Sequence, residues 1–176
     1  MNNFVKRTIS GVGFAAIMLA ALLTNKIVYG AVMLFALVVM MWEFLKMTCG
    51  SNYKYSQILS IIAGATLFLL VYFFKGFNLP GRLIILAFVP VFVLMINSLY
   101  IKDKSRFDKF ANLYTAIIYI SFPWSVMNFS VFAPDGTFNG YLLLSFFAII
   151  WGSDVGAYLF GITLGQKYGK KLFPSI

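Results

Sequence analysis

The chain has 176 residues, of which 61% are hydrophobic and only 11% are charged, whereas about a quarter of the residues in a soluble domain are charged. This composition excludes an ordinary soluble domain. The net charge of +9 is carried mainly by short loops between apolar stretches, which favours anionic lipid headgroups and phosphorylated substrates, and not nucleic acid, as partners.

Six apolar stretches approach the length that crosses a bilayer, roughly 20 residues, and they predict an all-α, polytopic integral membrane protein with a single membrane-embedded domain, residues 1–176. In chain order the predicted transmembrane helices cover residues 9–23, 27–45, 58–74, 83–99, 111–132 and 141–160. The first stretch follows Lys6 and Arg7, as the apolar part of a signal peptide would. Because it lacks a small-residue cleavage site, we interpret it as the first helix of a transmembrane hairpin. Pro90 and Pro123 fall inside the fourth and fifth stretches and are expected to kink those helices.

The basic residues predict the orientation of the helices, because cytoplasmic loops carry an excess of lysine and arginine. With a cytoplasmic N-terminus, eleven of the 14 basic residues face the cytoplasm, and Lys26, Lys75 and Arg82 face outward. The even number of helices then places both termini in the cytoplasm. The eleven are Lys6, Arg7, Lys46, Lys54, Lys102, Lys104, Arg106, Lys109, Lys167, Lys170 and Lys171.

Asp154 lies inside the sixth predicted helix, in the stretch "IIWGSDVGAYLFG". An ionised carboxylate inside a membrane span costs several kcal/mol unless it is paired, hydrated or bound to a metal, and it usually faces a bundle interior or a water-filled cavity. At about 100° per residue, Tyr158, Gly161 and Gly165 lie within roughly 40° of the Asp154 direction. This face leads to a basic segment at the cytoplasmic rim, which contains Lys167, Lys170 and Lys171.

A carboxylate in a cavity with a basic rim suits a phosphate-bearing substrate bridged by a divalent cation. Because the chain contains no histidine, a metal bound by these residues would use oxygen ligands, which favours an ion such as Mg²⁺. The predicted substrate-binding residues are Tyr158, Gly161, Gly165, Lys167, Lys170 and Lys171. The alternative is that Asp154 pairs with a lysine or caps a helix break, and that the glycines serve packing only.

Gly152 and Gly156 form a GxxxG pair on the face opposite Asp154. Such pairs allow close approach of helices in membranes. The pair suits a homodimer and packing within the chain equally well.

The last 26 residues, "WGSDVGAYLFGITLGQKYGKKLFPSI", contain an aspartate followed by Gly-Ala-Tyr, spaced glycines and a basic segment that runs into Lys-Leu-x-Pro-x-Ile. This order of residues resembles the membrane-embedded phosphatidate cytidylyltransferases, also called CDP-diacylglycerol synthases. The matching positions are Asp154, Gly156, Ala157, Tyr158, Gly161, Gly165, Gly169, Lys170, Lys171, Leu172, Pro174 and Ile176. The opening "VKRTISGVGFAAIML" is similar to the usual start of that family.

The resemblance implies transfer of CMP from CTP to phosphatidate, with release of pyrophosphate, in a multi-pass protein of the inner (cytoplasmic) membrane. It implies that Asp154 binds or orients magnesium and that the three lysines attract a phosphate group. In the family the motif continues with Ser-Pro-Lys-Lys, and a further signature with Lys-Arg, Lys-Asp and His-Gly-Gly segments follows. We therefore expect that the 176 residues are an N-terminal fragment, or a truncated gene product, lacking roughly the last third.

Two other functions fit the composition. A small ion-coupled transporter would use Asp154 as its proton or cation site. A non-catalytic membrane scaffold would tolerate replacement of Asp154.

Overall fold

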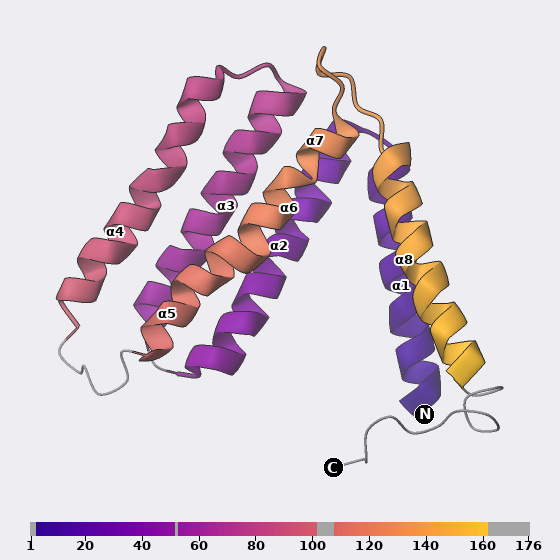
Figure 1. Cartoon of the computed structure of the whole chain (residues 1–176), viewed down its shortest axis with the longest axis horizontal. Helices are drawn as coiled ribbons and strands as arrows, with labels where there is room; N and C mark the ends of the chain where they lie inside the picture. Colours follow the sequence, from indigo (N-terminus) through magenta and orange to yellow (C-terminus); the bar gives the residue numbers. More distant parts are fainter. Residues whose placement is uncertain (1–2, 52, 102–107, 162–176) are drawn as a thin grey trace.

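The computed structural model describes residues 3–51, 53–101 and 108–161 (Figure 1). Within these ranges the chain is helical, with no β-strand. The elements are α1 (Asn3–Leu23), α2 (Lys26–Cys49), α3 (Lys54–Gly76), the 3₁₀-helix η1 (Gly81–Ala87), α4 (Phe88–Leu99), α5 (Asp108–Thr115), the π-helix η2 (Ala116–Ser121), α6 (Phe122–Val126), α7 (Asn128–Val131) and α8 (Tyr141–Phe160).

The predicted all-α membrane architecture is confirmed. Five helical stretches of the described chain are long and apolar enough to cross a bilayer: Lys26–Cys49, Lys54–Gly76, Gly81–Leu99, Lys109–Val131 and Tyr141–Phe160. The first predicted span corresponds to a shorter apolar stretch, Gly11–Leu23.

The helix ends alternate between two sides of the molecule. The start of α1, the turn between α2 and α3, the facing ends of α4 and α5, and the end of α8 lie on one side, at the bottom of Figure 1. Lys46, Lys54 and Lys109 belong to this side, which the excess of basic residues predicts to face the cytoplasm. Lys26 and Lys75 belong to the opposite side.

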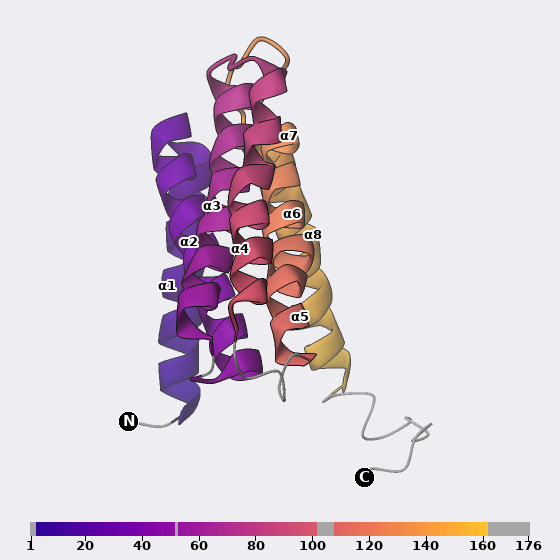
Figure 2. The ribbon, with the colours of Figure 1, turned by 90° about the vertical axis from the view of Figure 1, so that its left-hand side faces the viewer.

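The core of the bundle forms where α2 and the α5–α7 segment pack on α3 (Figure 2). On α2 the side chains at intervals of four residues make one buried stripe, as a helical period requires. They are Tyr29, Met33, Leu37, Met41, Leu45 and Cys49. The other faces of α2 are also apolar, with Phe35 71% exposed, as expected for a helix surrounded by lipid.

Hydrogen bonds from side chains join the central helices. The Ser60 hydroxyl donates to the Leu113 carbonyl oxygen at 2.7 Å, and the Ser121 hydroxyl donates to the Gly64 carbonyl oxygen at 2.8 Å. The indole N–H of Trp124 on α6 donates to the Met33 carbonyl oxygen at 2.9 Å. Small and hydroxyl side chains allow close approach of membrane helices, and each such bond contributes about 0.6 kcal/mol on average.

Both prolines inside spans coincide with a change of helix type. Pro123 has no N–H to donate four residues back. The preceding turn widens into η2, where the N–H of Phe122 reaches the Ile117 carbonyl, five residues back. In the fourth span the 3₁₀-helix η1 gives way to α4 two residues before Pro90. The prolines thus mark irregular helix geometry; whether they also kink the helices, as the sequence suggests, stays a prediction.

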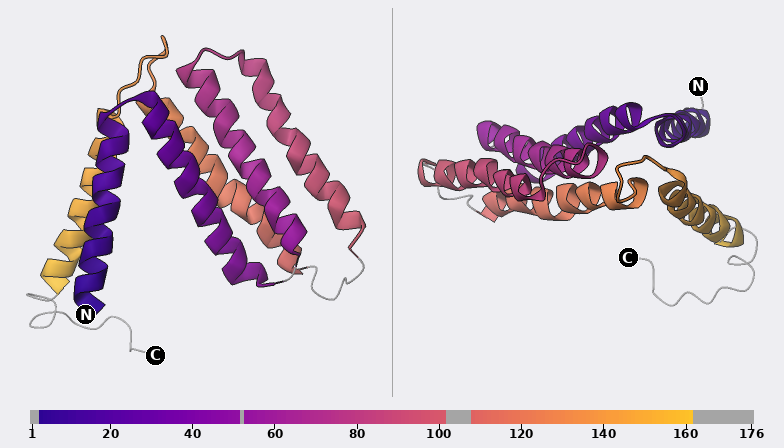
Figure 3. Two further views of the ribbon diagram at one scale, coloured as in Figure 1. Left: turned by 180° about the vertical axis from the view of Figure 1, so that it is seen from behind. Right: turned by 90° about the horizontal axis from the view of Figure 1, so that it is seen from above.

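Helices α1 and α8, the two ends of the described chain, lie side by side at one edge of the molecule (Figure 3). Gly140, which caps the start of α8, lies against α1. A Cβ at this position would collide with the backbone carbonyl of Leu22 on α1. Beyond this end, α8 is largely exposed, and Leu143 is its one buried residue.

Candidate functional site

Asp154 lies in the second half of α8, toward the end that belongs to the basic side of the molecule. Its side chain is exposed. Among the residues that the structure describes, it makes no hydrogen bond or ion pair. The described helices alone therefore do not enclose the carboxylate in the cavity that the sequence leads one to expect.

Tyr158 and Gly161 share the Asp154 side of α8, as helical geometry predicts. The Tyr158 side chain is 65% exposed, and nothing lies within 4 Å of the position that a Cβ on Gly161 would take. The structure thus brings these two residues and Asp154 to one open face of a single helix. The other predicted substrate-binding residues, Gly165, Lys167, Lys170 and Lys171, lie outside the described residues.

An open face with a carboxylate has an energetic consequence in a bilayer. Placing an ionised aspartate in the hydrocarbon core costs about 2.5–3.5 kcal/mol on insertion scales. The described helices provide no counter-charge that would offset this cost. Contact of the Asp154 face with water, or with a group other than those helices, would remove this cost.

The donor chemistry at Asp154 is compatible with magnesium. In the described part of the chain, no three histidine, cysteine, aspartate or glutamate side chains come close enough together to hold a metal ion. Magnesium, however, is often bound through one or two carboxylates together with substrate phosphates and water. Asp154 fits that mode as one oxygen ligand, with the remaining ligands supplied by substrate and solvent.

An apolar groove that sequence reasoning missed lies between α6–α7 and α8. The cavity has a volume of about 550 Å³, and Pro123, Met127, Phe147 and Ile150 are among the residues that line it. Ile150 is one helical turn before Asp154, so the groove runs along α8 to within a turn of the carboxylate. Pro123 was a sequence signal for irregular geometry here, but hydropathy does not indicate which helices border a groove.

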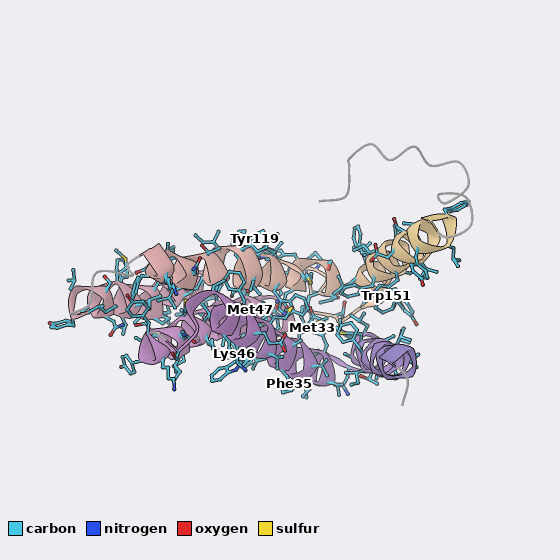
Figure 4. The ribbon with its side chains drawn as sticks, turned by 90° about the horizontal axis from the view of Figure 1, so that it is seen from below. Met33, Phe35, Lys46, Met47, Tyr119 and Trp151 are labelled. Atoms are coloured by element: carbon cyan, nitrogen blue, oxygen red, sulfur yellow. The ribbon has the colours of Figure 1, made fainter. Side chains whose placement is uncertain are left out.

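One residue of α8 close to Asp154 is less open. Trp151 is half-buried, stacks on Phe147 with ring centroids 5.9 Å apart and lies on the side of α8 that faces the bundle (Figure 4). At the GxxxG residues Gly152 and Gly156, nothing lies within 4 Å of the position that an added Cβ would take. These glycines are therefore not packed against any described helix.

The chain was compared with known proteins at the level of families, curated sequences and solved structures. The model of the cytidylyltransferase family matches residues 5–176, almost the whole chain. A search of curated proteins and a search of solved structures each found no match.

Proposed function

Because this chain belongs to the cytidylyltransferase family, we propose that it transfers the cytidylyl group of CTP to phosphatidate, giving CDP-diacylglycerol and pyrophosphate in phospholipid biosynthesis. The family makes it a CTP-utilising transferase, and its apolar helices make it a multi-pass membrane protein. Phosphatidate as the acceptor and phospholipid biosynthesis as the pathway are proposals that go beyond the family match.

The observation that carries the choice of a lipid acceptor is the position of Asp154 next to an apolar groove. The groove between α6–α7 and α8 contains almost only hydrocarbon side chains and reaches Ile150, one turn before Asp154. An acceptor that fits both features has acyl chains and a phosphate at one end. Phosphatidate has this form, and its terminal phosphate is the nucleophile that cytidylyl transfer requires.

The reaction needs positioning and charge neutralisation more than a protein nucleophile. An oxygen of the lipid phosphate forms a bond to the α-phosphorus of CTP, and the bond from that phosphorus to the bridging oxygen of the β-phosphate breaks. Pyrophosphate leaves with the electron pair. Asp154 would hold a divalent cation that neutralises phosphate charge, and Lys167, Lys170 and Lys171 attract the anionic substrates.

Magnesium bound at Asp154 would neutralise negative charge on the phosphate oxygens. Asp154 lies one turn beyond Ile150, the last residue of α8 that lines the apolar groove. At this place the lipid phosphate and the nucleotide can both approach from the basic side of the membrane. We place the protein in the cytoplasmic membrane, since CTP is a cytoplasmic nucleotide. Nothing lies within 4 Å of the Cβ positions of Gly152 and Gly156, so this face of α8 is available for a homodimer contact.

The proposal is tested by replacing Asp154 with asparagine in the full-length protein. Asn keeps the size of the side chain and removes its charge, so turnover of labelled CTP into chloroform-extractable lipid should fall by about 100-fold or more, as loss of a key electrostatic group does. Asp135→Asn is the matched control, because Asp135 lies in the exposed turn between α7 and α8 and on the opposite side of the membrane. It should retain activity.

Near-normal turnover by the Asp154→Asn variant would show that Asp154 has no role in the reaction. An ion-coupled transporter would give a different result: no lipid-soluble product from CTP, but solute movement across a vesicle wall that depends on Asp154. A scaffold would show neither activity.

A further inference from the structure

A second cavity lies at the turn between α2 and α3, on the basic side of the molecule. Its volume is about 460 Å³, and its lining includes Trp42, Lys46, Gly50, Lys54 and Gln57. We call it the α2–α3 cavity. It is formed by different helices from those that carry Asp154 and the apolar groove of α8.

The turn that shapes this cavity is held by local hydrogen bonds. Gly50 has a φ of +62°, a backbone conformation that glycine adopts without the steric cost of a Cβ. Its N–H donates to the Lys46 carbonyl oxygen at 3.1 Å. The side-chain amide of the buried Gln57 donates to the Gly50 carbonyl oxygen at 3.1 Å. These two bonds hold Gly50, one of the residues that line the cavity, in place.

Positive charge converges on the cavity from both helices. Lys46 lies in the last turn of α2, and Lys54 is the first residue of α3. Both are exposed, and neither has an ion pair or hydrogen bond in the described part of the chain. The nearest acidic side chain along α2, Glu43, is exposed and does not line the cavity.

The start of α3 adds partial positive charge. The first N–H groups of a helix point out of its N-terminal end and favour an anion nearby. Figure 4, seen from the basic side, shows Lys46 on the α2 side of the bundle, away from Tyr119 on the fifth span.

The wall of the cavity toward the bilayer is apolar. Trp42 lies one turn before Lys46 on α2, and Ile58 lies one turn after Lys54 on α3, so both are deeper in the membrane than the lysines. Trp42 is 54% exposed and Ile58 is 48% exposed. Cations at the rim with an aromatic and an aliphatic side chain beneath them match a molecule with a phosphate above and hydrocarbon below.

We propose that the α2–α3 cavity binds an anionic phospholipid of the cytoplasmic leaflet, with the headgroup phosphate between Lys46 and Lys54 and an acyl chain against Trp42 and Ile58. A soluble phosphate would use the lysines but leave the apolar wall unused. The assignment does not depend on the proposed function, because it rests on neither Asp154 nor CTP.

Fluorescence of Trp42 reports directly on this site. The full-length protein is placed in phosphatidylcholine bilayers that contain a low mole fraction of brominated phosphatidylglycerol, since bromine quenches a nearby indole. Subtracting the signal of a Trp42→Phe variant isolates Trp42. Quenching should exceed that given by the same mole fraction of brominated phosphatidylcholine, because the anionic lipid occupies the cavity.

Lys46→Gln and Lys54→Gln should each reduce this lipid preference by roughly five-fold, the factor expected for one basic residue at an anionic surface. Lys54→Arg should retain it. Arg82→Gln is the matched control: it removes one exposed charge at the opposite end of the bundle, where the outer leaflet carries the same lipid, and it should leave Trp42 quenching unchanged.

Three outcomes would overturn the proposal. Equal quenching by the two brominated lipids would show that the cavity does not select charge. An equal loss in Arg82→Gln would show general attraction to the membrane. Displacement of the brominated lipid by millimolar pyrophosphate, but not by unlabelled phosphatidylglycerol, would assign the cavity to a soluble phosphate.

Discussion

The contact between α1 and α8 depends on the absence of a side chain at Gly140. A Gly140→Ala variant would place its Cβ against the carbonyl group of Leu22, which is backbone and cannot rotate away. The native φ of −81° and ψ of −4° at this position are accessible to alanine. The cost of the substitution is therefore steric.

Overpacking of this kind costs about 1–3 kcal/mol, and we expect the upper half of that range because the obstruction is backbone. Gly140 is an N-cap residue and not in the helix interior, so alanine gains no helix propensity there. For a chain of this size a loss of about 2–3 kcal/mol lowers the unfolding midpoint by roughly 4–12 °C.

Thermal unfolding in detergent, followed by circular dichroism, measures this shift. Gly13→Ala in α1 is the matched control, since nothing lies within 4 Å of its Cβ position and alanine inside a helix is favoured over glycine by up to about 1 kcal/mol. The control should melt at the same or a slightly higher temperature. If Gly140→Ala melts together with the control, α1 and α8 do not approach each other as described.

Two further predictions concern individual hydrogen bonds. Trp124→Phe removes the bond to the Met33 carbonyl oxygen and should cost about 0.6–1.7 kcal/mol, a fall of a few degrees in the unfolding midpoint; an unchanged midpoint would mean that the bond contributes nothing. Asp135 accepts hydrogen bonds from the backbone N–H and the hydroxyl of Thr137, which lower the pKa of its carboxyl group. Its stabilising effect is therefore present above the ordinary aspartate pKa and is lost as the pH falls through the lower folded-state value. Thr137→Val removes the hydroxyl donor and should raise that pKa, shifting the acid limb of the stability profile upward; coincident profiles would contradict the assignment.

Hydropathy was sufficient to predict the helices but not their full extent. The second helix continues to Cys49, beyond its predicted end at residue 45, and the third begins at Lys54, before its predicted start at residue 58. Both extensions carry a lysine. Long basic side chains reach the headgroup region while their stems remain on the apolar surface, so a helix continues past the point where its hydropathy falls.

The neighbours of each helix could not be predicted in this way. All faces of a membrane helix are apolar, because lipid and protein are both apolar surroundings, and the pattern that identifies a buried stripe in a soluble helix is weak. The pairing of α1 with α8 depends on Gly140, whose importance becomes visible only when Leu22 lies opposite. The conversion to a π-helix before Pro123 also exceeds what a proline alone predicts.

In the candidate site, too, some features could be predicted from the sequence and others could not. Asp154 stood out because an ionisable residue inside a span is costly, and its shared face with Tyr158 followed from helical geometry. The apolar groove beside it was not predictable, since it is formed by α6, α7 and α8 together. The roles assigned to Asp154 and to the residues beyond the described range remain predictions.

The most direct test of the central claim is the acceptor dependence of cytidylyl transfer. Purified full-length protein is incubated with magnesium and CTP labelled at the α-phosphorus, together with either phosphatidate or diacylglycerol of the same acyl composition. We expect labelled CDP-diacylglycerol and an equal amount of pyrophosphate with phosphatidate, and no labelled lipid with diacylglycerol, which lacks the attacking phosphate. Release of pyrophosphate without labelled lipid, or labelling of another acceptor in preference to phosphatidate, would contradict the proposed function.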